Sequence, residues 1–298
     1  MSRPPIVDAH HHIWRLADLT WLHGPPVPRI FGAYDAIRRD YTIDEYVAEA
    51  TPAGVARSVY VQTNWPPDHA VDEVAWVQAV ADRHGFPHAI VGFADLAAPD
   101  VERTLDALCA FRHLRGIRQQ LHWHARPQYR FATRPDVASD PTWRRGLAMV
   151  ARRGLVFELQ VFAGQMGEGI RLAHDFPDLT FVLLHAGMLE DRTPAGWSQW
   201  RAGMEGLAAC PNVVVKLSGL GTFVRACALD LWRPVIEETV AMFGADRCMF
   251  GSNFPVEKLW TSYADVVAVT ETALAGLGEA ERTAVWRDTA LRVYRIAS

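Results

Sequence analysis

The sequence of 298 residues lacks several features that define whole classes of protein. It has no apolar run approaching the roughly 20 residues that a membrane-spanning helix needs, so we expect no membrane partner. Its formal net charge of -4 indicates no basic surface for nucleic acid. No GxGxxG motif follows a predicted strand, which argues against a doubly wound, dinucleotide-binding sheet. These absences leave a small molecule as the expected partner.

Cysteine and lysine are also scarce. The four cysteines are widely spaced and form no CxxC pair, which argues against a disulfide framework or a zinc knuckle. The chain reaches its first predicted strand too early for a signal peptide, so we expect a cytoplasmic location. Of the 30 basic residues only Lys216 and Lys258 are lysines, whereas half of the chain is apolar and can bury a large core.

Short apolar runs alternate with stretches that accept a helix. The predicted strands are 6–14, 58–64, 89–96, 114–121, 155–162, 180–187, 213–220 and 248–255. The predicted helices between and after them are 68–85, 99–113, 140–153, 165–176, 197–209, 228–244, 262–277 and 279–296. Because parallel neighbours need a crossover, this alternation predicts an α/β fold, a (β/α)8 TIM barrel with a C-terminal helix, as one domain over 1–298.

Two segments follow the first predicted strand. The segment from Arg15 to Tyr41 is rich in Trp, Pro and Gly, and a loop of this length is expected to form a lid or a pocket wall. A helix is expected to begin after Thr42, with Thr42 and Glu45 forming a capping box.

The first strand, IVDAHHHIW, ends in three consecutive histidines. Successive side chains of a strand point to opposite faces, so His10 and His12 are expected on one face and His11 on the other. Polar residues also gather toward the late ends of the other predicted strands, where a barrel carries its catalytic groups. With His10 and His12, the candidate site residues are Gln62, Asn64, Arg118, Gln120, Glu158, Gln160, His185, Lys216 and Asn253.

Six motifs in order, DAHHHIW, VQ, GIR, LLHAG, VKLSG and FGSNFPV, make the sequence resemble the amidohydrolase superfamily over nearly its whole length. The closest resemblance is to its Amidohydro_2 branch of TIM-barrel hydrolases, which includes sugar-acid lactonases and the pyrone dicarboxylate lactonase. The resemblance implies that His10 and His12 are the first-strand pair that binds a divalent metal or polarises the substrate. It implies the metal or carbonyl-polarising role for His185 as well.

The sequence departs from the family pattern at two positions. Asn253 stands where the family typically has an aspartate that activates water, and an amide cannot accept the proton of the water. Strand five has Glu158 and Gln160 where metal-binding members have a histidine. Two routes remain open: His10, His12 and His185 hold Zn²⁺, or no metal binds.

In the metal-free route, a histidine or Glu158 activates water while Arg118 and Lys216 hold a substrate carboxylate or the oxyanion. The expectation leans to this route, with Asn253 orienting water or substrate. Arg118 and Lys216 have an alternative role, which is to neutralise Glu158 or Asp95. We expect Glu257 and Lys258, which follow the eighth predicted strand, in a solvated turn, with a position at the site as the alternative.

The sequence therefore predicts a hydrolase, specifically a lactonase that opens a small carboxylated or sugar-acid lactone. Two alternatives are a metal-dependent decarboxylase of the same superfamily and a binding protein that has lost catalysis through Asn253. If the chain is a binding protein, we expect Asn253→Asp to restore hydrolysis. If it is an active enzyme, we expect the same change to leave the activity similar or lower. A homo-oligomer is left open.

Overall fold

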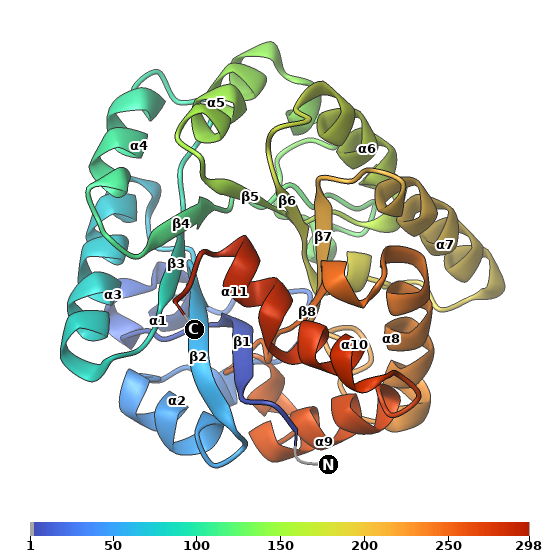
Figure 1. The fold of residues 1–298 in the computed structure, drawn as a ribbon. Helices are drawn as coiled ribbons and strands as arrows, with labels where there is room; N and C mark the ends of the chain where they lie inside the picture. Colours follow the sequence, from blue (N-terminus) through green and yellow to red (C-terminus); the bar gives the residue numbers. More distant parts are fainter. Residues whose placement is uncertain (1–2, 298) are drawn as a thin grey trace.

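Eight parallel strands form the centre of the molecule, as predicted. The computed structural model describes residues 3–297. The strands pair in chain order (Figure 1) and are β1 (Ile6–His11), β2 (Val55–Val61), β3 (Ala89–Gly92), β4 (Leu114–Ile117), β5 (Val156–Leu159), β6 (Phe181–Leu183), β7 (Val213–Leu217) and β8 (Cys248–Phe250).

The residues after β8 close the sheet against β1. The Asn253 backbone N–H donates to the His10 carbonyl at 2.7 Å, and the His12 N–H donates to the Phe254 carbonyl at 2.8 Å. Gly251 permits this approach, because a Cβ there would lie 2.8 Å from the His10 Cβ. The sheet is therefore a barrel, and closure places the histidines of β1 beside the segment that follows β8.

Helices surround the barrel, and most predicted segments are confirmed with slightly shorter bounds. They are α1 (Thr20–His23), α2 (Ile43–Ala50), α3 (Ala70–His84), α4 (Val101–Cys109), α5 (Pro141–Arg152), α6 (Met166–Asp175), α7 (Pro194–Ala208), α8 (Leu229–Phe243), α9 (Tyr263–Ala273), α10 (Glu279–Thr283) and α11 (Thr289–Val293). The predicted helix 279–296 is divided into α10, a π-helical turn at Ala284–Asp288, and α11. No helix within residues 3–297 has both the length and the apolar character to cross a membrane.

The end of the chain covers the amino-terminal opening of the barrel. Figure 1 shows α11 lying across this opening. Ala290, Val293 and Tyr294 pack in one apolar cluster with small inward-facing strand residues, among them Val59 and Val182. A larger apolar cluster lies between the strands and the outer helices. With one opening filled, the carboxyl end remains for a binding site.

The strands end three to five residues earlier than predicted; β5 ends at Leu159 and β7 at Leu217, for example. Glu158 and Lys216 therefore lie inside strands, whereas Gln160 follows its strand. Inward side chains of a barrel stack in layers along its axis. The earlier strand ends thus place Glu158 and Lys216 one layer deeper than Gln160.

The predicted capping box at α2 is wrong, although Thr42 does occupy the N-cap position. The Thr42 side chain makes no capping hydrogen bond. The Glu45 carboxylate instead forms ion pairs with Arg39 at 2.6 Å and Lys258 at 2.6 Å. Two cations compete more strongly for this carboxylate than one backbone N–H does.

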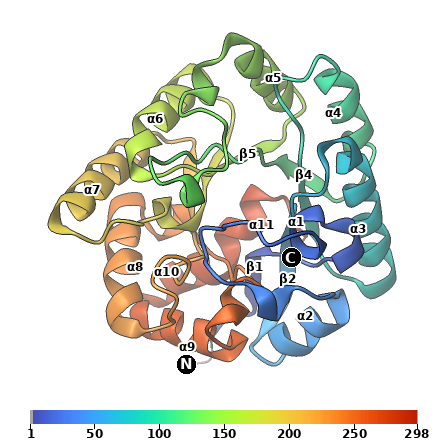
Figure 2. The same cartoon turned by 180° about the vertical axis from the view of Figure 1, so that it is seen from behind.

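Two long segments cover the carboxyl end of the barrel, and both lie in front in Figure 2. One runs from the end of β1 to α2, and the other from β4 to α5. The first contributes Trp21, Arg29 and Phe31 to the lining of a cavity. The prediction that Arg15 to Tyr41 forms a pocket wall is confirmed.

Candidate active site

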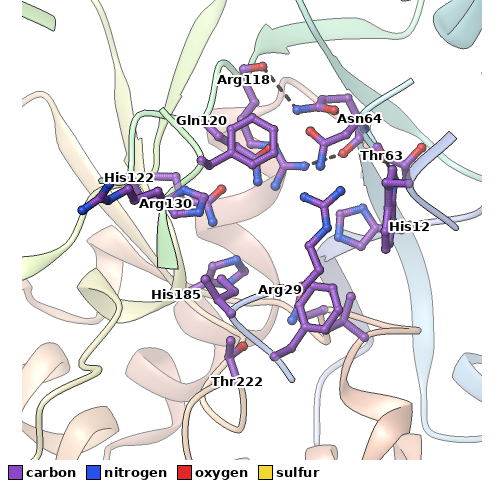
Figure 3. Close-up of a pocket in the computed structure, with 18 of the residues that line it drawn as sticks. His12, Arg29, Thr63, Asn64, Arg118, Gln120, His122, Arg130, His185 and Thr222 are labelled. Carbon is purple, nitrogen blue, oxygen red and sulfur yellow. Dashed lines mark hydrogen bonds between the residues drawn. The ribbon is translucent and has the colours of Figure 1, made fainter. Parts of the chain in front are cut away.

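A cavity of about 730 Å³, including its open mouth, lies at the carboxyl end of the barrel. Its walls come from strand ends and from the two covering segments (Figure 3). The predicted site residues that line it are His12, Gln62, Asn64, Arg118, Gln120, Gln160, His185 and Asn253. The fold thus brings most of the predicted site together.

Three histidines form a cluster at the base of the cavity. The His10 ring centroid lies 5.1 Å from that of His12 and 4.8 Å from that of His185. His11 faces the other way and stacks on Tyr46 at 3.8 Å, as the strand alternation predicts. His10 is fully buried behind the other two rings and is absent from the lining of the cavity.

Hydrogen bonds fix two of these imidazoles and leave ring nitrogens free. The His12 Nδ1–H donates to the Val61 carbonyl at 2.7 Å, so His12 Nε2 keeps its lone pair. The His185 Nδ1 pairs with the Ser218 hydroxyl at 2.9 Å. Both ring nitrogens of His10 are buried without a hydrogen-bond partner.

Burial keeps this cluster uncharged. It lowers the pKa of His12 to about 3, with the Arg118 charge as the next cause. The pKa values of His10 and His185 are also lowered, mainly by burial and then by the nearby Lys216 and Arg118 cations. At neutral pH the three imidazoles are therefore neutral, which suits hydrogen bonding or metal ligation better than proton abstraction.

Three arginines, Arg29, Arg118 and Arg130, line the cavity from different segments (Figure 3). The Arg130 guanidinium is bound to its own loop, where it donates to the backbone carbonyls of His124 at 2.6 Å and Ala125 at 2.7 Å. Arg118 donates from Nη2 to the Gln62 carbonyl, but its Nε and that of Arg29 are buried without a partner. Burial lowers the pKa of Arg118 to about 10, so it stays charged at neutral pH. No aspartate or glutamate lines the cavity within the described residues. The cavity is therefore positively charged.

Three lining residues have the left-handed backbone conformation. Asn64, His185 and Asn253 have φ values of 63°, 56° and 57°, and each comes shortly after a strand. This conformation is costly for residues other than glycine, although asparagine adopts it more readily than most, and it clusters at functional sites. It turns these side chains at the end of the strand toward the cavity.

Glu158 and Lys216 lie below the cavity and do not line it. Both are fully buried, and the Lys216 ammonium donates to Glu158 Oε1 at 2.5 Å. The Tyr294 hydroxyl donates to the same oxygen at 2.6 Å. Burial lowers the pKa of Lys216 to about 8, and the Glu158 charge opposes this shift. The pair takes the alternative role of mutual neutralisation, whereas Arg118 makes no ion pair with Glu158 or Asp95.

Two cationic lining residues were not predicted. Arg29 lies in the segment expected to be a pocket wall, but nothing in its local sequence distinguishes it from other loop arginines. Arg130 lies in the β4–α5 segment, and only the length of that segment is a signal for it.

The expectation of a solvated turn is wrong for Glu257. Its side chain is fully buried, and burial raises its pKa to about 8. Lys258 lies on the outside, where it pairs with Glu45 and Glu49. The two neighbours in sequence therefore face opposite environments.

The barrel and its histidine-lined cavity at the carboxyl end define the class as a TIM-barrel enzyme. The family model described as "Amidohydrolase" matches residues 7–296. The chain belongs to this amidohydrolase family and is a hydrolase.

Named relatives cover nearly the full chain. "Uncharacterized protein y4mH" of Sinorhizobium fredii is 40% identical over an alignment of 298 residues that covers 99% of this chain and 100% of the relative. An L-fucono-1,5-lactonase of Burkholderia multivorans is 31% identical over 97% of this chain and 96% of its own. A zinc-bound amidohydrolase crystal structure from Burkholderia multivorans is similar with a TM-score of 0.83, 29% identity, and coverage of 99% of this chain and 100% of that chain.

The zinc in that similar structure gives no support to the expectation of a metal-free route. The residue types of His10, His12 and His185 suit a divalent metal, because neutral imidazoles with free nitrogens are zinc ligands. A hydrogen bond from His12 Nδ1–H to a backbone carbonyl is also what usually orients a zinc-binding histidine. As placed within residues 3–297, however, His, Cys, Asp and Glu side chains form no cluster of three or more in metal-binding geometry.

Proposed function

We propose that this hydrolase opens the ring of a small lactone that carries a carboxylate, including lactones of sugar acids. The observation that carries the proposal is a cavity lined by Arg29 and Arg118, with no carboxylate in its wall among residues 3–297 and with two neutral histidines at its base. The lactonase named among the relatives supports the choice of ester.

The arginines account for the substrate carboxylate. Arg118 and Arg29 each have a buried Nε–H without a partner, and a carboxylate can accept from two such donors at once. An anion bound there also relieves the repulsion between neighbouring cations. An uncharged substrate offers these donors only neutral acceptors and brings no counter-charge for the guanidinium groups.

The histidines account for the ring opening. His12 Nε2 has a lone pair and accepts a hydrogen bond from the attacking water. If the Ser218 hydroxyl donates to His185 Nδ1, then His185 Nε2–H points outward as a donor for the substrate carbonyl. Water adds to this carbonyl and the ring C–O bond breaks. One proton of the water goes to the ring oxygen, which becomes the hydroxyl group, and the other is released, so the product is a hydroxy carboxylate.

A divalent metal would be held by His10, His12 and His185. When bound, it would polarise the carbonyl and lower the pKa of a water to near 7, which these weakly basic imidazoles do not achieve. The weak basicity of His12 is the reason to include the metal in the proposal.

The test is a hydrolysis screen over carboxylated, sugar-acid and uncharged lactones, followed by proton release, with zinc content measured by elemental analysis before and after chelation. We expect turnover of carboxylated lactones, lost in His12→Gln and retained in the surface control His69→Gln. Turnover of none of these lactones would contradict the proposal. Release of CO₂ from an aromatic or unsaturated acid would indicate a decarboxylase, and ligand binding without turnover would indicate a binding protein. No observation on residues 3–297 specifically favours either alternative.

A further inference from the structure

A buried carboxyl group, that of Glu257, lies directly behind the cavity. The chain leaves β8 and makes one turn from Asn253, whose backbone carbonyl accepts from the Glu257 N–H at 3.3 Å. This turn brings the Glu257 side chain back against the Asn253 side chain, and Asn253 Nδ2 donates to Glu257 Oε1 in a long hydrogen bond of 3.5 Å. Asn253 lines the cavity, whereas Glu257 does not.

The surroundings of Glu257 are built to hold this carboxyl. Trp260 Nε1 donates to Oε2 at 2.5 Å, and Gly221 leaves the space, since a Cβ there would collide with both Glu257 and Trp260. Glu257 is 0% exposed, and among residues 3–297 it is held by hydrogen bonds and not by a cation. Burial without a counter-ion raises the pKa of Glu257 to about 8, and ionising this carboxyl is costly, so a role in stability alone explains it poorly.

The hydrogen bond determines which way the Asn253 amide faces. An amide has one donor end and one acceptor end. Above its pKa of about 8, the ionised Glu257 carboxylate only accepts, so it binds the Nδ2 end as in the structure, and the Oδ1 end then faces the cavity.

We propose that Glu257 is a positioning residue for the hydrolysis: it holds the Asn253 amide so that Oδ1 accepts a hydrogen bond from the attacking water. That hydrogen bond directs one O–H of the water to Asn253 and a lone pair to the substrate carbonyl. Asn253 does not take the proton. This inference rests on the proposed lactone hydrolysis.

The test exchanges the amide and the carboxylate group between positions 253 and 257 and keeps the length of each side chain. Kinetics are measured for wild type, Glu257→Gln, Asn253→Asp and the double variant with a carboxylated lactone at pH 9, where Glu257 is ionised, after subtracting spontaneous hydrolysis. In Glu257→Gln the new amide has only one acceptor oxygen, so it can accept from either Asn253 or Trp260. Its NH2 group then faces the N–H donor of the other residue, and that hydrogen bond is lost. We expect kcat to fall ~10- to 100-fold, the loss of one aimed hydrogen bond, with KM changed less than about 2-fold.

In Asn253→Asp two carboxyl groups lie side by side and repel, so kcat also falls. In the double variant the introduced glutamine donates to the introduced aspartate and accepts from Trp260. Both hydrogen bonds are restored, and only the one between positions 253 and 257 has its direction reversed. We expect the double variant to be at least ~10-fold faster than Asn253→Asp. Trp260→Phe is the matched control, because it removes the other hydrogen bond to Glu257 and leaves Asn253 in place, and its kcat should fall less than that of Glu257→Gln.

The outcomes separate this inference from the proposed function. If wild type hydrolyses the lactone but the losses in the two single variants simply multiply, Glu257 does not position Asn253 and the inference is wrong. If wild type hydrolyses no lactone, the proposed function fails first. Thermal unfolding of each variant shows whether it is folded, and a purely structural Glu257 would lower the melting temperature without the rescue.

Discussion

A substitution at Lys216 tells two roles of this side chain apart. Lys216 is expected from the sequence to hold a substrate carboxylate, whereas in the structure it forms a buried ion pair with Glu158. If Lys216 held a substrate carboxylate, Lys216→Met would raise KM and leave the fold intact. In the structure both side chains are 0% exposed and the ion pair is 2.5 Å long. Methionine would keep the length of the side chain and leave Glu158 as an uncompensated buried charge, with Tyr294 its remaining donor.

Removing one partner of a buried ion pair costs about 3–5 kcal/mol, whereas replacing both with neutral groups can be nearly neutral. We therefore expect Lys216→Met to lower the free energy of unfolding by about 3–5 kcal/mol at pH 7. The double variant Lys216→Met/Glu158→Gln should recover most of this loss, because the introduced glutamine still accepts from Tyr294.

Urea unfolding followed by tryptophan fluorescence measures both effects. A change below about 0.5 kcal/mol in Lys216→Met, together with a raised KM, would refute the reasoning and return Lys216 to the substrate site.

Three further predictions concern charge in the cavity. Arg118→Gln and Arg29→Gln should each raise KM for a carboxylated lactone about 10- to 100-fold, because each removes a charge-assisted hydrogen bond worth ~1.5–3 kcal/mol. An equal rise in KM for an uncharged lactone would contradict this prediction. Burial holds the pKa of His12 at about 3 in the folded protein, below the value of 6.5 in the unfolded chain. Below pH 6.5 the unfolded chain therefore binds more protons, and the free energy of unfolding falls by about 1.4 kcal/mol per pH unit for this group. Melting temperatures at pH 7.5 and 5 test this, and an unchanged value would contradict it. Zinc should raise the melting temperature of wild type and not of His12→Gln, whereas equal shifts would remove the histidines from the metal site.

The sequence predicts the barrel well because its evidence is local. Alternation of apolar runs and helical segments needs no knowledge of distant contacts, and the same period of two places His10 and His12 together and His11 outside. The late position of polar residues in each run also predicts a shared cavity, since all parallel strands end at one opening.

Depth along the barrel axis could not be predicted. Glu158 and Gln160 face inward alike, and only the ends of β5 and β7 show that Glu158 is below the opening and beside Lys216. Glu257 was misplaced for a related reason, because its burial depends on Gly221 and Trp260, which come from other segments.

The measurement that most directly tests the central claim compares kcat/KM for one carboxylated lactone and for its uncharged counterpart with the same ring. Because no acidic residue of the described chain lines the positively charged cavity, we expect wild type to prefer the carboxylated lactone by ~100-fold or more and Arg118→Gln to lose most of this preference. Equal rates for the two lactones, or a preference for the uncharged one, would contradict the account.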